Sequence, residues 1–118
     1  MSYVDGFVLP LPKGKIDAYR EIAELAGRVW REHGALQYRE CVIDEHDDPM
    51  AKSFPSGISA KDGETVVFAW IEYESREHRD EVNAKAMEDP RIAGIDPKSM
   101  PFEFERMLHG GFNVLVEA

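Results

Sequence analysis

Residues 65–73 read TVVFAWIEY and form the most strand-like segment of the chain. β-Branched and aromatic residues favour strands. Side chains alternate between the two faces of a strand, and both alternating sets in this run are largely apolar. A strand with one face in water would instead alternate apolar and polar residues. We therefore predict that 65–73 is a central strand whose two faces are both covered.

Three further segments have strand character. Residues 3–9, YVDGFVL, precede Pro10, which lacks the N–H that a sheet ladder needs, so we predict that this strand stops there. Residues 35–43, ALQYRECVI, form the second predicted strand. The last is expected over 102–108 and is interrupted at Gly110 and Gly111.

Two segments have helical periodicity. From 13 to 33, apolar residues recur at steps of three and four, namely at Ile16, Tyr19, Ala23, Ala26 and Trp30. This spacing predicts an amphipathic helix, and Gly34 is a suitable stop. A second helix is expected over 75–88, with Ser75 as N-cap and Pro90 beyond its end.

The resulting order, β-α-β-β-α-β, predicts an α+β chain of the ferredoxin-like class. Right-handed βαβ crossovers then give a four-stranded antiparallel sheet with two helices on one face. The length of 118 residues fits one domain spanning 1–118.

The two helices leave the second face of this sheet uncovered. That face would carry Val66, Phe68 and Trp70, so we predict that it packs against the same face of a second copy. The alternative is a monomer in which the long hydrophilic loop from Asp44 to Glu64 folds over the face.

The composition of the chain favours some cellular locations and binding partners over others. The net charge of −9 disfavours nucleic acid and anionic lipid as partners, and no apolar run reaches the length of a membrane span. The N-terminus lacks a basic start and a long apolar run, so we expect no signal peptide. The single cysteine, Cys41, suits the reducing cytoplasm, where we place the protein, and we expect a buried, inert thiol.

Several segments strongly resemble the YbaA-like family of small bacterial proteins of unknown function. The most specific are HRDEVNAK at 78–85 and the MPF…RM…GGF pattern near the end of the chain. The resemblance implies the dimeric α+β barrel superfamily, in which two sheets pack face to face. It brings no substrate, cofactor or catalytic residue, and Glu105 departs from a basic residue that the family often has there.

Charged side chains fall near the middles of four predicted strands, at Asp5, Glu40, Glu72 and Arg106. By alternation we expect the three carboxylates to point into the enclosed face beside Trp70 and Tyr38. Carboxyl groups in an apolar space have raised pKa values and serve as acids or bases. The alternative is a set of ion pairs with Arg106 or Arg39 that fixes how two subunits meet.

A second polar group lies at the start of the second helix, with His78, Arg79 and Asn83. A helix N-terminus with an arginine favours a bound carboxylate or phosphate, whereas a solvated helix with its own ion pairs is the alternative. The full set of ligand-binding candidates is Tyr38, Glu40, Trp70, Glu72, His78, Arg79, Asn83 and Arg106.

The sequence gives only weak indications of a cofactor or a metal site. Relatives in the superfamily include cofactor-independent and haem-degrading oxygenases and ligand-binding sensors. Trp70 and His78 would suit haem degradation, but Tyr3 and Asp5 stand where the first strand would need an asparagine. The acidic loop residues Asp44, His46, Asp47 and Asp48 have irregular spacing, so we predict no metal and no cofactor.

Two function classes remain. The first is a homodimer that encloses a small organic ligand, an aromatic one included, as a binding protein or minor enzyme. The second is a protein-interaction or stress-related accessory dimer without catalysis, which uses the Asp44–Glu64 loop. An oxygenase-like enzyme is a third alternative, drawn from the resemblance alone.

Overall fold

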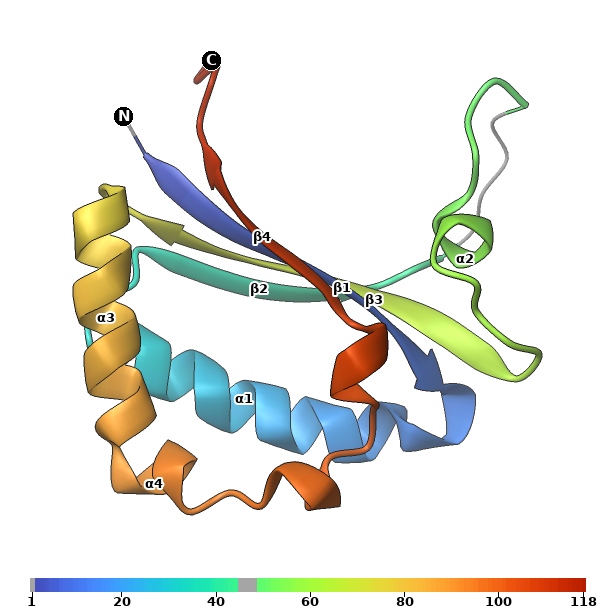
Figure 1. The fold of residues 1–118 in the computed structure, drawn as a ribbon, viewed down its shortest axis with the longest axis horizontal. Helices are drawn as coiled ribbons and strands as arrows, with labels where there is room; N and C mark the ends of the chain where they lie inside the picture. The colour runs from blue at the N-terminus through green and yellow to red at the C-terminus, as the bar shows by residue number, and fades with distance from the viewer. Residues whose placement is uncertain (1, 45–48) are drawn as a thin grey trace.

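The computed structural model describes residues 2–44 and 49–118. Its sheet has the antiparallel order β2-β3-β1-β4, with the two longest strands at the centre (Figure 1). The strands are β1 (Tyr3–Pro12), β2 (Gln37–Val42), β3 (Glu64–Tyr73) and β4 (Leu108–Asn113). The predicted ferredoxin-like α+β class is confirmed, as is the central place of β3.

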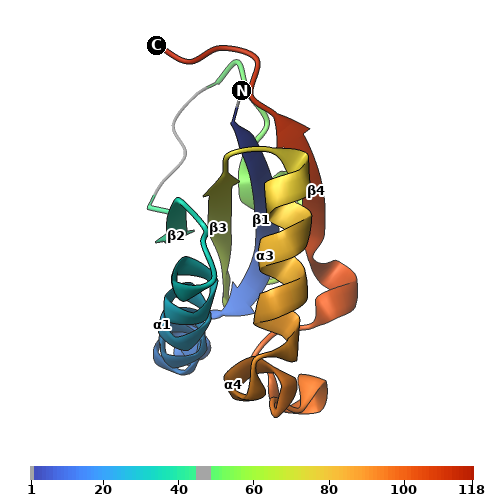
Figure 2. The same cartoon turned by 90° about the vertical axis from the view of Figure 1, so that its left-hand side faces the viewer.

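Two long helices, α1 (Ile16–Glu32) and α3 (Arg76–Glu88), lie on one face of the sheet (Figure 2). The Ser75 hydroxyl accepts a hydrogen bond from the His78 N–H, so the predicted N-cap is confirmed. Short helical segments are η1 (Lys13–Lys15), α2 (Phe54–Gly57), α4 (Pro90–Ala93), η2 (Pro97–Ser99) and η3 (Phe104–Arg106).

The core lies between the sheet and these two helices. Residues paired directly across an antiparallel ladder share a face, and Tyr3 opposes Tyr73 while Leu9 opposes Val67. All four are buried, and so are Val29 of α1 and the α3 residues Val82 and Ala86.

The first strand is longer than predicted, because it runs through Pro10 to Pro12. On its outer side β1 pairs with β4 only from Tyr3 to Val8, so its edge is free beyond that point. The Lys13 N–H bonds to the Gly63 carbonyl on the β3 side, so by alternation the two prolines face the free edge. No ladder hydrogen bond is lost there.

The last strand is displaced from its predicted position. It covers Leu108–Asn113, while residues 102–107 are irregular around η3. The glycines that were expected to break the strand lie inside it. At Gly111 a glycine is needed, because a Cβ there would clash with the Tyr3 hydroxyl oxygen. Only glycine allows the two strands to approach under that ring. Arg106 therefore lies outside the sheet, and its predicted mid-strand place is wrong.

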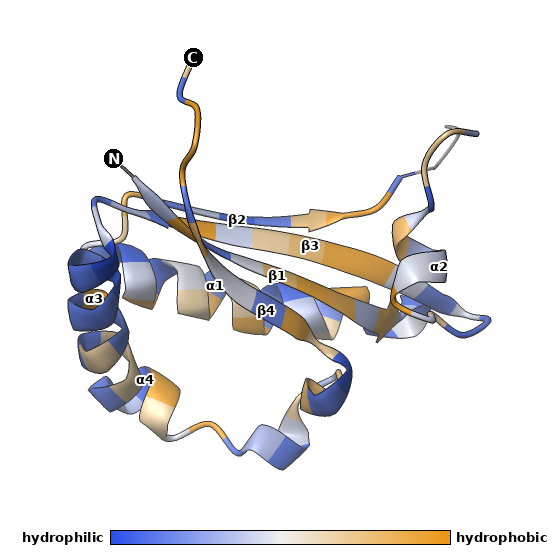
Figure 3. Ribbon diagram, turned by 45° about the horizontal axis from the view of Figure 1, so that its top comes forward, coloured by the Kyte–Doolittle hydropathy of each residue, from blue (hydrophilic) through white to orange (hydrophobic). Residues whose placement is uncertain are grey.

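The face away from the helices carries the apolar residues Val66, Phe68, Leu108 and Phe112. The β3 ribbon that contributes two of them is largely hydrophobic (Figure 3). At one end α2 covers this face, where Phe54 packs on Phe68 with ring centroids 6.1 Å apart and Val66 is buried. Phe68 nevertheless remains 41 % exposed, and Leu108 and Phe112 of β4 are 57 % and 60 % exposed. We call these three residues the open-face patch. In the alternative prediction the loop covers this face, but its described residues 49–63 reach only one end of it, through α2.

Cys41 is exposed, so the prediction of a buried thiol is wrong. It lies on β2, an edge strand, and points to the same open side as Arg39.

Candidate functional site

A cavity of about 300 Å³ lies between the sheet and the helices. Its walls are almost entirely apolar and come from β1, β3, α1, α3 and the irregular segment before β4. They include Phe7, Leu9, Ala26, Trp30, Ala69, Ile71, Met87, Phe102, Phe104 and Met107.

One carboxyl group, that of Glu40, enters this wall. The Tyr19 hydroxyl donates to Glu40 Oε1 at 2.6 Å, and the Tyr38 hydroxyl donates to Oε2 at 2.7 Å. Tyr19 comes from α1, whereas the other two come from β2. Gly27 of α1 allows this approach, because a Cβ there would stand 3.0 Å from the Tyr38 ring. We call Tyr19, Tyr38 and Glu40 the carboxylate triad.

Burial sets the protonation properties of the triad. It raises the pKa of Glu40, and the hydrogen bonds from the two hydroxyl groups oppose that rise only in part. Burial and the neighbouring carboxylate raise the pKa of both tyrosines far above their ordinary value. The two hydroxyl groups therefore remain donors, and Glu40 is a carboxyl group that gains a proton more readily than one in water.

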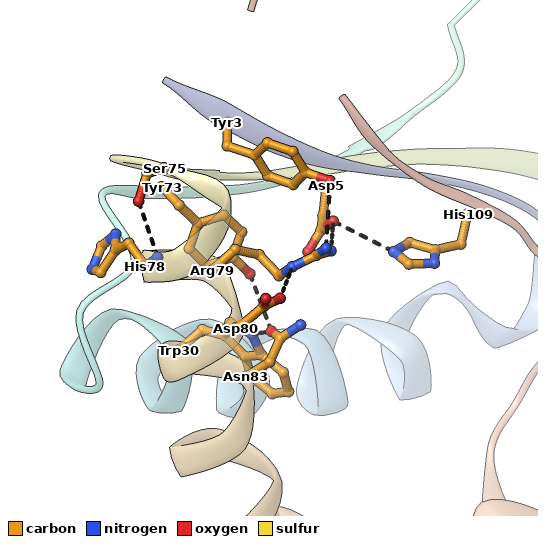
Figure 4. Close-up of polar contacts among 10 residues, drawn as sticks. All are labelled: Tyr3, Asp5, Trp30, Tyr73, Ser75, His78, Arg79, Asp80, Asn83 and His109. Atoms are coloured by element: carbon orange, nitrogen blue, oxygen red, sulfur yellow. Dashed lines mark hydrogen bonds and ion pairs between the residues drawn. The ribbon is translucent and has the colours of Figure 1, made fainter. Parts of the chain in front are cut away.

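A second polar cluster joins β1 to α3 (Figure 4). Arg79 Nη1 donates to Asp5 Oδ1 at 2.6 Å, and its guanidinium lies 4.9 Å from the centre of the Tyr3 ring. Asp5 is 1 % exposed. His109 Nε2 lies 3.6 Å from the same carboxylate oxygen, and its ring stacks on Phe7. The anion that Arg79 was predicted to bind is thus the protein's own Asp5.

The remaining helix candidates have structural partners. Asn83 Oδ1 accepts from Trp30 Nε1 at 2.9 Å and from the Tyr73 hydroxyl at 3.3 Å, which fixes the indole in the cavity wall. His78 Nδ1 accepts from the Glu74 N–H at 3.0 Å, and its ring meets Tyr73 edge to face.

The predicted candidates do not form one site. Glu40 opposes Ala69 in the ladder and so faces the helices, whereas Trp70 and Glu72 are one step out of phase and face the open side. The prediction that Asp5, Glu40 and Glu72 share one enclosed face is therefore wrong. Glu72 lies with Trp70 on the face away from the helices, whereas Asp5 and Glu40 face the helices. Trp70 lies under the Arg39 guanidinium at 5.9 Å, on the other side of the sheet from His78.

Arg106 and Asp5 also have other partners than expected. Arg106 makes two hydrogen bonds with Glu64, at 2.7 and 2.8 Å, and Asp5 pairs with Arg79 rather than with Arg106 or Arg39. The error for Arg106 follows from placing it within a strand. The pair of Asp5 with Arg39 fails because Arg39 faces the open side of the sheet and Asp5 faces the helices.

For two residues of the cavity wall, the sequence predicted only a place in the hydrophobic core. Tyr19 and Trp30 belong to the apolar stripe of α1, and spacing does not reveal that their polar atoms reach Glu40 and Asn83. The useful signal is the residue type, since a buried tyrosine or tryptophan finds a hydrogen-bond partner.

Metal ligands and membrane spans were sought as well. His46, Asp47 and Asp48 lie outside the described residues; across 2–44 and 49–118, no three His, Cys, Asp or Glu side chains gather as metal ligands would. Over the same ranges, each helix is too short or too polar to cross a membrane.

Two solved structures share this fold. One is a candidate antibiotic biosynthesis monooxygenase from Nitrosomonas europaea, with a TM-score of 0.59 and 16 % identity over 97 % of this chain and 90 % of that one. The other is an uncharacterized NIPSNAP domain protein from Burkholderia xenovorans, with a TM-score of 0.59 and 17 % identity over 98 % and 94 %. At these identities the likeness concerns the fold alone.

Other proteins are much more similar to this chain in sequence than these two structures are. The chain is 44 % identical over 117 residues to the uncharacterized protein YbaA of Escherichia coli K12, covering 99 % of each. The same values hold for YbaA of Shigella flexneri. Residues 2–104 match the family described as "Protein of unknown function (DUF1428)". The chain therefore belongs to the DUF1428 family, together with YbaA.

Proposed function

We propose that this protein is a cytoplasmic homodimer in which each subunit, a single domain of residues 1–118, binds a small and largely apolar organic molecule between sheet and helices. The observation that carries the proposal is Glu40, a partly buried carboxyl group held by two tyrosines in an otherwise apolar cavity wall. The cytoplasmic location rests on the single cysteine.

The cavity has the size and character of a ligand site. Its volume of about 300 Å³ stands at the lower end of the usual range for small-molecule pockets. Such pockets combine apolar walls with a few fixed polar groups that orient the ligand. Aromatic side chains from three different segments, Phe7, Trp30 and Phe102, favour a flat ligand.

Glu40 supplies the specificity. A carboxylate has about four acceptor positions, and the two tyrosines occupy two of them. The remaining positions suit a ligand N–H or O–H, so aromatic amines and phenols are the expected class. The raised pKa of Glu40 also favours a second candidate function, a proton-transfer enzyme in which this carboxyl group acts as acid or base.

The open-face patch supports the homodimer. Phe68, Leu108 and Phe112 together present more apolar side chain to water than scattered surface residues usually do. Their cover by an identical patch is the simplest closed arrangement.

N-Phenyl-1-naphthylamine, an uncharged aromatic amine, is a suitable probe. In a Trp70→Phe background Trp30 becomes the sole tryptophan, and it lies in the cavity wall. We expect saturable quenching of its fluorescence by the probe. Glu40→Gln should weaken binding about tenfold, the equivalent of one hydrogen bond to a charged group.

Ala69→Leu is a second variant, which fills the cavity from β3 opposite Glu40, and it should abolish binding. Quenching that is equal in the parent, the Glu40→Gln variant and the Ala69→Leu variant would place the probe elsewhere and defeat the proposal.

A further inference from the structure

The outer edge of β2 is a free edge of the sheet. Within the described residues β2 pairs with β3 alone, so one side of its backbone lacks a strand partner. A groove of about 580 Å³ runs beside this edge, between β2 and α1, which lies beneath the strand (Figure 2). The carboxylate triad lines both this groove and the cavity, so it separates the two spaces. We call this hollow the edge groove.

The backbone of β2 presents hydrogen-bonding groups to the free edge. The Ile43 N–H donates to the Val66 carbonyl at 2.9 Å, so the backbone at Ile43 points toward β3. This direction alternates along an antiparallel pair, and therefore Tyr38, Glu40 and Val42 turn their N–H and C=O groups away from β3. An extended peptide that adds to the sheet as a strand would pair with these groups.

The α1 wall of the edge groove is basic, although the whole chain has a net charge of −9. Arg20, Arg28 and Arg31 line the groove, together with one exposed carboxylate on the same helix, Glu24. Arg28 takes part in no ion pair within the described residues, and Arg20 pairs with Asp17, which is 92 % exposed. These arginines are free to bind carboxylates of a partner.

The floor of the edge groove is apolar, with Leu11, Ala23 and Val67 all buried. Ala23 lies between Arg20 and Arg28 on α1, and this helix runs along β2 (Figure 1). Eight residues of helix rise about 12 Å, and four residues of strand span about 13 Å. Two acidic side chains four positions apart on an added strand therefore match the two arginines, with an aliphatic side chain between them on the floor.

We propose that the edge groove binds an extended acidic segment of another protein, which adds as a fifth strand beside β2. Its recognition pattern is two acidic residues four positions apart with an aliphatic residue midway. This inference goes beyond the proposed small-molecule site and does not depend on it, because the edge groove and the cavity lie on opposite sides of the carboxylate triad.

Fluorescence anisotropy of a labelled peptide tests the proposal. The probe is fluorescein-labelled Thr-Glu-Thr-Val-Thr-Glu-Thr, and its uncharged counterpart has glutamine in place of both glutamates. We expect the full chain to bind the acidic peptide saturably and the counterpart at least tenfold more weakly.

The double variant Arg20→Gln/Arg28→Gln should bind the acidic peptide about tenfold more weakly, because two partly exposed ion pairs are lost. Arg76→Gln/Lys98→Gln is the matched control. It removes two positive charges from exposed positions outside the groove, so it corrects for the change in net charge and should leave the affinity unchanged.

Backbone pairing has a readout of its own. Saturating acidic peptide should slow amide hydrogen exchange at Tyr38, Glu40 and Val42 at least tenfold. Val42→Pro removes one outward N–H and no bond to β3, and β1 already carries Pro10 and Pro12 at its free edge. This variant should bind at least tenfold more weakly, whereas Val42→Ala, which keeps the N–H, should bind as wild type does.

Four results would overturn the proposal. One is equal affinity for the acidic and the uncharged peptide, and another is an equal loss of affinity in the two double variants. Binding without slower exchange at residues 38, 40 and 42 would show a contact between surface charges only. Exchange at these residues that slows with protein concentration in the absence of peptide would show that a second copy occupies the edge.

Discussion

At the scale of single residues, Glu40 is the most informative side chain. Its carboxyl group lies where the apolar cavity and the edge groove meet, and it accepts hydrogen bonds from Tyr19 and Tyr38. Such a placement costs desolvation energy that a purely structural core would avoid by using an apolar residue. The proposed ligand site would give a reason to retain it.

This placement predicts a pH dependence of stability. The pKa of Glu40 is higher in the folded chain than its ordinary 4.5, so the folded state binds more protons than the unfolded state between those two values. The contribution of Glu40 to the free energy of unfolding is therefore favourable below about pH 4.5 and is lost as the pH rises through the folded pKa.

Glu40→Gln removes this dependence. Urea unfolding of wild type and variant should show the variant gaining stability relative to wild type as the pH rises from about 4.5 to neutral. Glu24→Gln, an exposed change on the α1 wall of the same groove, should show no such trend. A difference that does not vary with pH would count against a raised pKa.

Glu64 predicts the opposite behaviour. Its hydrogen bonds with Arg106 hold its pKa at about 2, below an ordinary 4.5, so its stabilising contribution is present above about pH 4.5 and is lost as the pH falls toward 2. Glu64→Gln should flatten the acid limb of the stability curve, whereas Glu105→Gln, an exposed neighbour of Arg106, should leave it unchanged. An equal acid slope in wild type and Glu64→Gln would contradict the assignment.

At the scale of elements, the Asp5–Arg79 pair fastens α3 to β1. Both groups are largely withdrawn from water, with side chains 2 % and 14 % exposed. Removal of one partner from a buried pair leaves an unpaired charge and costs about 3–5 kcal/mol.

Arg79→Met should therefore destabilise the fold by about 3 kcal/mol, because the buried Asp5 loses its shortest charged contact and keeps only His109, at 3.6 Å. The double variant Asp5→Asn/Arg79→Met should recover part of this loss, which a double-mutant cycle measures. Arg76→Met, in the first turn of the same helix but exposed, is the matched control. A loss no larger than that of Arg76→Met would show that the pair contributes little.

A comparison of the predicted and observed helices and strands shows which of them the sequence alone could predict. The helices and β3 were predicted well, because α1 has a full apolar stripe and β3 a continuous apolar run. The errors at Pro10 and at Gly110–Gly111 share one cause. Both residue types break strands locally, but here a free edge tolerates the prolines and the Tyr3 ring requires the glycine. Such contacts join distant segments, so local propensity does not reveal them.

The candidate site was predicted only in part for a related reason. Tyr38 and Glu40 were placed together correctly, since they lie two apart on one strand. Placing Glu72 and Trp70 with them required the register between strands, and a shift of one residue reverses the face.

At the scale of the whole molecule, the proposed homodimer rests on the open-face patch. Phe112→Glu would put a charge in the proposed interface, so the dimer dissociation constant should rise about a hundredfold, the equivalent of roughly 3 kcal/mol. Met87→Glu is the matched control, because Met87 is also 60 % exposed but lies on α3. Sedimentation over a range of concentrations measures both, and equal constants would exclude this face as the interface.

The most direct test of the account is native mass spectrometry of wild type and Glu40→Gln, purified side by side from the same cells. We predict a wild-type dimer that carries the added mass of a small organic molecule, and a variant dimer without it. A wild-type monomer free of added mass would contradict both the assembly and the ligand site proposed for this protein.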